Sequence, residues 1–131
     1  HSEGLLLLTT DGDFANHISA PATHVEQTYV AKVNGPLTDE QLAQFRSGIS
    51  LHGRRTAPAQ IKLIKWATNP WYEITITEGR QNQIRIMFQS FGRLVEKLRR
   101  VRIGKLKLDI PVGEFRHLTE KEVALLLKAK P

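Results

Sequence analysis

The run from Glu78 to Arg85 holds the residues best suited to chemistry, because it puts two arginines where a strand should end and a helix begin. The first turn of a helix leaves backbone N–H groups without helical partners, and such groups bind anions, most often phosphate. Seven more cations follow, interrupted by one acid, Glu96: Arg93, Lys97, Arg99, Arg100, Arg102, Lys105 and Lys107. This spacing indicates a surface that binds a nucleic-acid backbone.

The charge of the chain is concentrated in this region. From Arg80 to Lys107 the chain has nine lysines and arginines and one acid. The remainder has ten lysines and arginines and twelve acids, and the net charge of the whole chain is +6. A local excess of positive charge favours a polyanionic partner more strongly than a diffuse excess does. Composition alone leaves open the alternative of a solvated basic face.

Length and composition limit the kind of protein. The 131 residues suit one domain, which we expect to span residues 1–131. The absence of cysteine excludes disulfides and thiolate metal sites, and the five histidines lack metal-ligand spacing, so we predict no metal site. No apolar run reaches membrane-spanning length and no signal-peptide pattern is present. We therefore expect a cytoplasmic monomer that does not bind membranes.

Apolar periodicity predicts strands interleaved with helices. Alternation predicts strands over residues 25–33, 57–67 and 71–77 and an extended basic segment over 94–103, after a short strand over 5–8 and a helix beginning near residue 10. Capping boxes predict helices that begin at Thr38 and Thr119, and the stripe of Ile84, Met87, Phe88 and Phe91 predicts a third. We expect an α+β fold with a mixed, mainly antiparallel sheet and packed helices.

Two side-chain expectations follow from these elements. In a regular extended segment Arg100 and Arg102 share one face and Arg99 takes the other, so the three cannot all point into one groove. Trp66 and Trp71 are expected to pack in the core rather than to stack on bases.

The motifs, taken in order, resemble one family: the ribosomal-RNA pseudouridine synthases that usually carry an N-terminal S4 domain. Four stretches match: Ser2–Asp13 resembles the segment after the family's catalytic Arg-Leu-Asp, Gln27–Tyr29 its Lys-Thr-Tyr motif, Glu78–Arg85 its Glu-Gly-Arg-x-x-Gln-hydrophobic-Arg motif, and Leu98–Gly104 with Gly113–Thr119 its C-terminal block. Gln27 departs from the family's usual basic residue, and Ile86 stands where a second arginine is common.

The resemblance implies the fold of a pseudouridine synthase catalytic domain and an isomerase that converts uridine to pseudouridine in ribosomal RNA. This reaction has no redox step and needs no energy input, so we expect no cofactor. It needs a carboxylate near C1′, a cation that keeps the carboxylate ionised, and a base held by stacking. The resemblance puts the catalytic aspartate three residues before Ser2. The chain starts at His1 without an initiator methionine, so we expect a fragment or a processed product that lacks this acid.

The resemblance also assigns roles to individual residues. Arg85 matches the family's arginine that pairs with the catalytic carboxylate; the alternative is a solvated arginine beside the helix's apolar stripe. Tyr29 matches the tyrosine that stacks on the target base and helps to move its C5 proton; the alternative is a core tyrosine. Gln83 orients Arg85 or a phosphate, or lies on the helix surface. The expected RNA contacts are Arg80, Gln83, Arg99, Arg100, Arg102 and Lys105.

Two alternatives to the enzyme remain open at this stage. The first is a basic RNA-binding module without catalysis, such as a degenerate relative. The second, which the order of the motifs disfavours, is a structural protein of the ribosome. An Arg-Leu-Asp sequence at the expected distance before His1 would favour the enzyme over both.

The first prediction concerns this chain by itself. Residues 1–131 should not make pseudouridine from ribosomal RNA, because none of their own acids has a motif that supports it as the catalytic carboxylate. Incubation of the purified chain with ribosomal RNA, followed by quantification of pseudouridine, tests this. Product above the enzyme-free background would mean that the catalytic acid lies within the chain.

Overall fold

The fold comes from a computed structural model that describes residues 2–4, 25–51, 53–77, 81–107 and 116–127. Its sheet contains β1 (Ser2–Gly4), β2 (Gln27–Val33), β5 (Gln60–Lys65), β6 (Trp71–Ile76), β7 (Val95–Ile103) and β8 (Leu106–Lys107). The strand order is β1-β7-β2-β6-β5, with β8 paired to β7. The β1–β7 pair is parallel and the other pairs are antiparallel. The predicted mixed, mainly antiparallel sheet is confirmed.

Two helices pack against one face of this sheet. They are α2 (Asp39–Ser47) and α3 (Gln81–Ser90), and a short hairpin of β3 (Ser50–Leu51) and β4 (Arg54–Arg55) follows α2. Phe45 of α2 packs on Phe88 of α3 with ring centroids 5.3 Å apart, and Phe88 packs on Tyr72 of β6 at 5.9 Å. Because Tyr72 lies opposite Ala31 in the sheet, this core joins both helices to the centre of β2.

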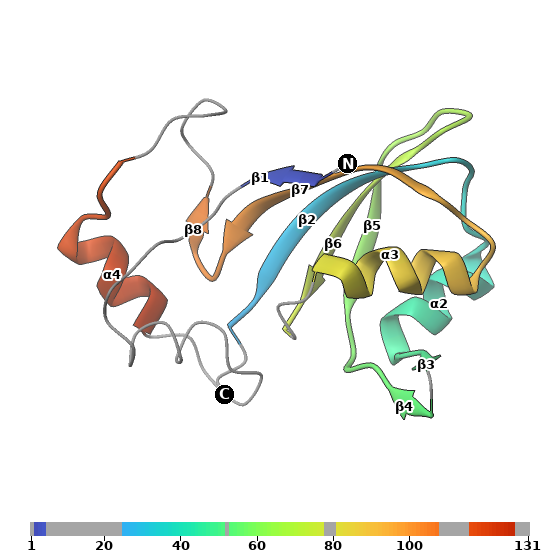
Figure 1. The fold of residues 1–131 in the computed structure, drawn as a ribbon, viewed down its shortest axis with the longest axis horizontal. Coiled ribbons are helices and arrows are strands. Elements are labelled where there is room, and N and C mark those ends of the chain that lie inside the picture. The colour runs from blue at the N-terminus through green and yellow to red at the C-terminus, as the bar shows by residue number, and fades with distance from the viewer. Residues whose placement is uncertain (1, 5–24, 52, 78–80, 108–115, 128–131) are drawn as a thin grey trace.

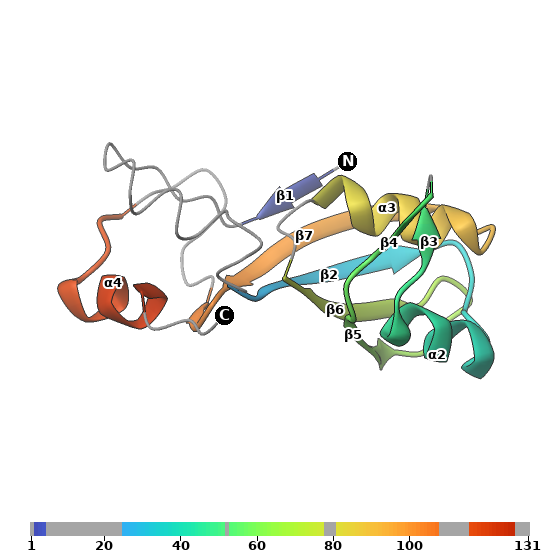
Figure 2. The same ribbon diagram turned by 90° about the horizontal axis from the view of Figure 1, so that it is seen from below.

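The third described helix, α4 (Glu120–Leu127), lies at the other end of the molecule, beside β8 (Figures 1 and 2). Leu126 is fully buried against Val25, Ile103 and Leu106, which form a second, smaller core. Leu127, in contrast, is exposed.

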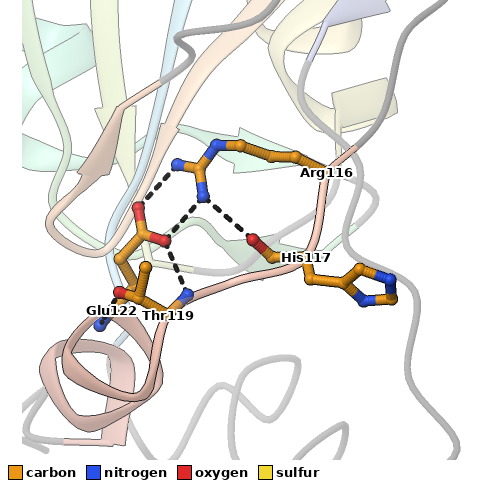
Figure 3. Close-up of polar contacts among 4 residues, drawn as sticks. All are labelled: Arg116, His117, Thr119 and Glu122. Carbon is orange, nitrogen blue, oxygen red and sulfur yellow. Dashed lines mark hydrogen bonds and ion pairs between the residues drawn. The ribbon is translucent and has the colours of Figure 1, made fainter.

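The start of α4 is fixed by a polar network (Figure 3). The Thr119 hydroxyl accepts from the Glu122 N–H at 3.1 Å, and the Glu122 carboxylate accepts from the Thr119 N–H at 2.9 Å, which confirms the predicted capping box. Arg116 donates to both Glu122 oxygens at 2.7 and 2.6 Å. Hydrogen bonds from Arg116, and then from the Thr119 backbone, lower the pKa of Glu122 to about 2. The cap therefore keeps its charge throughout the neutral range.

The second predicted capping box is also present. Thr38 and Gln41 exchange hydrogen bonds of 2.9 and 3.1 Å at the start of α2. The apolar stripe of α3 is confirmed as well, since Ile84, Met87 and Phe88 are fully buried and Phe91 packs at the edge of the core. The strand and helix predicted before residue 25, and the strand-to-helix corner at 78–80, lie outside the described residues.

One expectation about the core is wrong. Trp66 follows the last residue of β5 and is 69% exposed, whereas Trp71 is half-buried. The reason is that β5 is an edge strand and Trp66 lies in the turn that leads to β6. Side chains beyond the end of an edge strand have neighbours on fewer sides, so the apolar character of Trp66 did not predict burial.

The end of α2 yields a stability prediction. Gly48 has φ +106°, and a Cβ there would lie 2.5 Å from the Thr56 carbonyl oxygen, whereas Gly92 has φ +74° with open space around it. Gly92→Ala should therefore lower the free energy of unfolding by about 1–2 kcal/mol through backbone strain alone. Gly48→Ala should lower it further, because a backbone atom must also move. Urea denaturation of the two variants tests this, and equal losses would contradict it.

Candidate functional site

The site depends on an irregularity in how β7 pairs with β2. Along β2, consecutive residues Lys32 and Val33 pair with Lys97 and Val95, and Thr28 and Tyr29 pair with Arg102 and Arg100. Each step therefore leaves one extra residue on β7, Glu96 in the first case and Val101 in the second. These are β-bulges, which break the two-residue alternation of a strand.

The two bulges decide which face each cation of β7 occupies. Residues paired across the strands share a face, so Arg100 lies with Tyr29 on the face that the helices cover. Arg99, opposite Val30, and Arg102, opposite Thr28, lie on the other face. The expectation that Arg100 and Arg102 share a face is therefore wrong, because the extra residue Val101 reverses the alternation between them.

The buried Tyr29 and Gln27 form a polar cluster with the half-buried Arg100 on the helix-covered face. Tyr29 is 0% exposed and Gln27 is 4% exposed. The Tyr29 hydroxyl lies 3.4 Å from the Gln27 Oε1 atom, and Arg100 Nη1 donates to the same oxygen at 2.9 Å. The Arg100 contact has the length of a strong hydrogen bond, whereas the tyrosine contact is long for a hydroxyl donor.

Opposing effects act on the Tyr29 hydroxyl. Burial raises its pKa above the usual 10.0, and the charge and hydrogen bonding of Arg100 partly offset this rise. The net shift is upward, so Tyr29 is a neutral phenol at physiological pH and acts as a hydrogen-bond donor. The nearby guanidinium would stabilise any negative charge that develops on the phenol oxygen.

Arg85 reaches β7 at a different point. It lies on α3, is half-buried, and its Nη1 atom donates to the Val95 carbonyl at 3.1 Å. Arg85 is therefore not the fully solvated arginine of the alternative interpretation. It lies beside the buried stripe of α3, and its guanidinium is hydrogen-bonded to the backbone of β7. Gln83, one turn from Met87, is also half-buried and donates to the Met87 sulfur at 3.7 Å.

The other cations of β7, Lys97, Arg99 and Arg102, lie on the opposite face of the sheet from Tyr29. Lys97 is exposed, and Arg99 and Arg102 are half-buried; Lys32 lies opposite Lys97. The Nε atom of Arg99 is buried and has no hydrogen-bond acceptor among the residues that the structure describes. An oxygen-rich ligand would satisfy that donor.

The remaining predicted cations differ in their surroundings. Lys105 is exposed in the turn between β7 and β8. Arg93 instead donates to the Pro36 carbonyl at 3.1 Å, which fixes the turn before α2. Arg80 lies outside the described residues, so its predicted contact with phosphate stays a prediction.

Sequence reasoning missed the link between Gln27, Tyr29 and Arg100. The alternation of β2 places Gln27 and Tyr29 on one face and is readable from the sequence. The partner from β7 cannot be read from the sequence, because it depends on where the bulges lie.

Within the described ranges, no three His, Asp or Glu side chains gather as metal ligands, and no helix is long and apolar enough to cross a membrane.

Comparison with known proteins agrees with this geometry. Residues 1–90 match the RNA pseudouridylate synthase family. The chain is 40% identical over 125 residues to the ribosomal small subunit pseudouridine synthase A of Salmonella typhimurium, and 42% identical over 129 residues to the ribosomal large subunit pseudouridine synthase B of Bacillus subtilis. These alignments cover 92% and 95% of this chain, and the chain spans 53% of the length of each relative.

The fold gives the same result. A crystal structure of a pseudouridylate synthase superimposes with a TM-score of 0.86 at 35% identity, over 94% of this chain and 54% of the other. The order of the motifs, the architecture of the sheet and the similarity to these relatives therefore agree, and the chain belongs to the RNA pseudouridylate synthase family.

Proposed function

We propose that this chain forms part of the catalytic domain of a pseudouridine synthase that acts on ribosomal RNA in the cytoplasm. The observation that carries the proposal is the family match over residues 1–90. Relatives named for the small and the large ribosomal subunit align over almost the whole chain, which supports ribosomal RNA as the substrate class. The reaction breaks the N1–C1′ bond, turns the base and rejoins it through C5, and the proposal includes no cofactor.

Arg85 is the proposed partner of the catalytic carboxylate. The resemblance expects that acid three residues before Ser2, upstream of β1. Because β1 is parallel to β7 with Ser2 beside Leu98, moving upstream along β1 leads toward the Val95 end of β7. Arg85 donates to the Val95 carbonyl at that end, so its guanidinium lies on the side from which the acid would arrive. A guanidinium there would keep the carboxylate ionised and oriented.

Tyr29 is the proposed second catalytic residue, and its burial limits how it can act. The ring is 0% exposed, so a base can stack on it only after neighbouring side chains move. The hydroxyl already has polar partners in Gln27 and Arg100. Hydrogen bonding and help with the C5 proton therefore fit this geometry better than stacking does.

The sheet face opposite α2 and α3 is the proposed contact with the RNA backbone. Lys97, Arg99 and Arg102 project from one face of β7, with Lys105 in the turn that follows. The unsatisfied Nε of Arg99 supports a phosphate oxygen as its partner. Gln83 near the start of α3 stays a candidate contact, and so does Arg80, which lies outside the described residues. Arg100, by contrast, lies on the other face and is reassigned to Tyr29.

One observation favours a second candidate function. The complete burial of Tyr29 is the ordinary state of a core tyrosine, which fits an RNA-binding module without catalysis. Both functions use the same basic face. Turnover by a longer chain that carries Arg-Leu-Asp ahead of Ser2 separates them, because the binding module would show none.

RNA binding by this chain should depend strongly on salt. Each phosphate contact contributes about 0.7 to the slope of log affinity against log salt for a single strand. Replacing Lys97, Arg99 and Arg102 with glutamine should therefore flatten the slope by about two units. Titrations of an RNA fragment at several salt concentrations measure this slope.

The matched control removes three charges elsewhere. Arg54 and Arg55 on β4 and Lys65 on β5 are exposed, and β5 is separated from β7 in the sheet by β2 and β6. Their replacement with glutamine changes the net charge equally but should leave the slope nearly unchanged. If both triple variants flatten the slope equally, the basic face of β7 is not the binding surface.

The role of Arg85 is testable in the longer chain that carries Arg-Leu-Asp. Arg85→Met should slow single turnover by on the order of a hundredfold, since loss of a partner for a carboxylate in a desolvated site costs about 3 kcal/mol. RNA affinity should change little. Arg80→Met should instead weaken binding, and Tyr29→Phe should slow turnover without weakening binding.

Single-turnover kinetics at saturating enzyme separates these effects. Arg85→Lys, which keeps the charge but not the planar fork, should react at an intermediate rate. Near-normal turnover of Arg85→Met beside an inactive Arg80→Met would assign the carboxylate partner to Arg80. Normal turnover of Arg85→Met, Arg80→Met and Tyr29→Phe would refute the site.

A further inference from the structure

One oxygen atom, Gln27 Oε1, accepts from two side chains that the sheet places next to each other. Gln27 and Tyr29 share a face of β2, and the bulge at Val101 puts Arg100 directly opposite Tyr29. Arg100 Nη1 donates to this oxygen at 2.9 Å, and the Tyr29 hydroxyl lies 3.4 Å from it.

The arginine determines which way the glutamine amide points. A guanidinium has only donors, so Gln27 must present its oxygen rather than its NH₂ group to Arg100. The oxygen is also the atom beside the Tyr29 hydroxyl, so the tyrosine must donate to it. If the amide were reversed, the Tyr29 oxygen would instead accept from NH₂. The direction of the Tyr29 O–H bond therefore depends on Arg100.

We propose that Arg100 is a positioning residue for Tyr29, acting through the Gln27 amide and through its own charge. It directs the Tyr29 hydrogen toward Gln27, so that a lone pair of the hydroxyl oxygen faces away from that bond. It also supplies the positive charge that stabilises negative charge on that oxygen. The role for the reaction rests on the proposed function of Tyr29, whereas the effect on the hydroxyl itself does not.

The surroundings single out Arg100 as the charge that acts on Tyr29. Across from Tyr29 on its other side, β6 contributes Ile74, which is apolar and fully buried. The buried residues of α3 in this core, Ile84, Met87 and Phe88, are also apolar. The charged residue of α3 is Arg85, whose Nη1 donates to the Val95 carbonyl. Burial raises the pKa of Tyr29, and Arg100 opposes that rise.

The chain contains only two tyrosines, which makes the test direct. Replacing both with fluorotyrosine gives two fluorine NMR signals, and Tyr72→Phe assigns them. Arg100→Met should raise the pKa of Tyr29 further above its usual value, because a nearby positive charge is lost. Arg100→Lys, which keeps the charge and is the safer variant for folding, should give a smaller rise. The Tyr72 signal reports whether the core stays intact.

Arg99→Met is the matched control, since Arg99 adjoins Arg100 in the chain but lies on the opposite face. It should leave the Tyr29 titration unchanged. An Arg100→Met variant whose Tyr29 titrates as in the parent overturns the proposal. An Arg99→Met variant that shifts Tyr29 equally also overturns it, because the effect would then be one of net charge.

Kinetics in the longer chain that carries Arg-Leu-Asp complete the test. Arg100→Met should slow single turnover at saturating enzyme, with Arg100→Lys recovering part of the rate. A parent that makes no pseudouridine would overturn the proposed function, whatever the titration shows. If the parent makes pseudouridine and the Arg100→Met variant reacts at the same single-turnover rate, the positioning role of Arg100 is overturned.

Discussion

The pairing of β7 with β2 is the constraint on which the candidate site depends. The nine residues of β7 pair with the seven of β2 because Glu96 and Val101 are extra residues in bulges. Each bulge shifts the alternation, so the face that a side chain occupies changes along the strand. As a result, Val95, Leu98 and Ile103 all reach the buried face although they are three and five residues apart. Without these bulges the hydrophobic residues of β7 could not all be buried on one side.

The same irregularity distributes the cations of the basic segment over both faces of the sheet. Arg99 and Arg102 lie on the face opposite the helices, which is the proposed contact with RNA, and Arg100 lies on the helix-covered face beside Tyr29. Removing a cation partly from water is costly unless polar groups compensate it, and the buried Gln27 supplies an oxygen for the half-buried Arg100. The run of cations therefore does not form one surface, although it is continuous in the sequence.

Local signals predicted the elements well, because their causes are local. The capping boxes at Thr38 and Thr119 and the stripe of α3 arise from residues three or four apart, and all are present. The faces of β7 and the exposure of Trp66 depend on the neighbouring strand and on the position at the sheet edge. Resemblance to the family selected Tyr29 and Arg85, but only the pairing of strands shows which arginine contacts Tyr29 through Gln27.

Arg85 and Arg100 lie at different points along β7 and are therefore close to different groups. Arg85 on α3 donates to the backbone near the start of β7, on the side toward which the upstream continuation of β1 leads. Arg100 lies five residues further along β7, opposite Tyr29. A carboxylate arriving beside β1 would meet Arg85, whereas the phenol oxygen already meets Arg100 by way of Gln27. In the proposed site, the catalytic carboxylate and the neutral Tyr29 phenol would then each have their own cation, and neither cation would be shared.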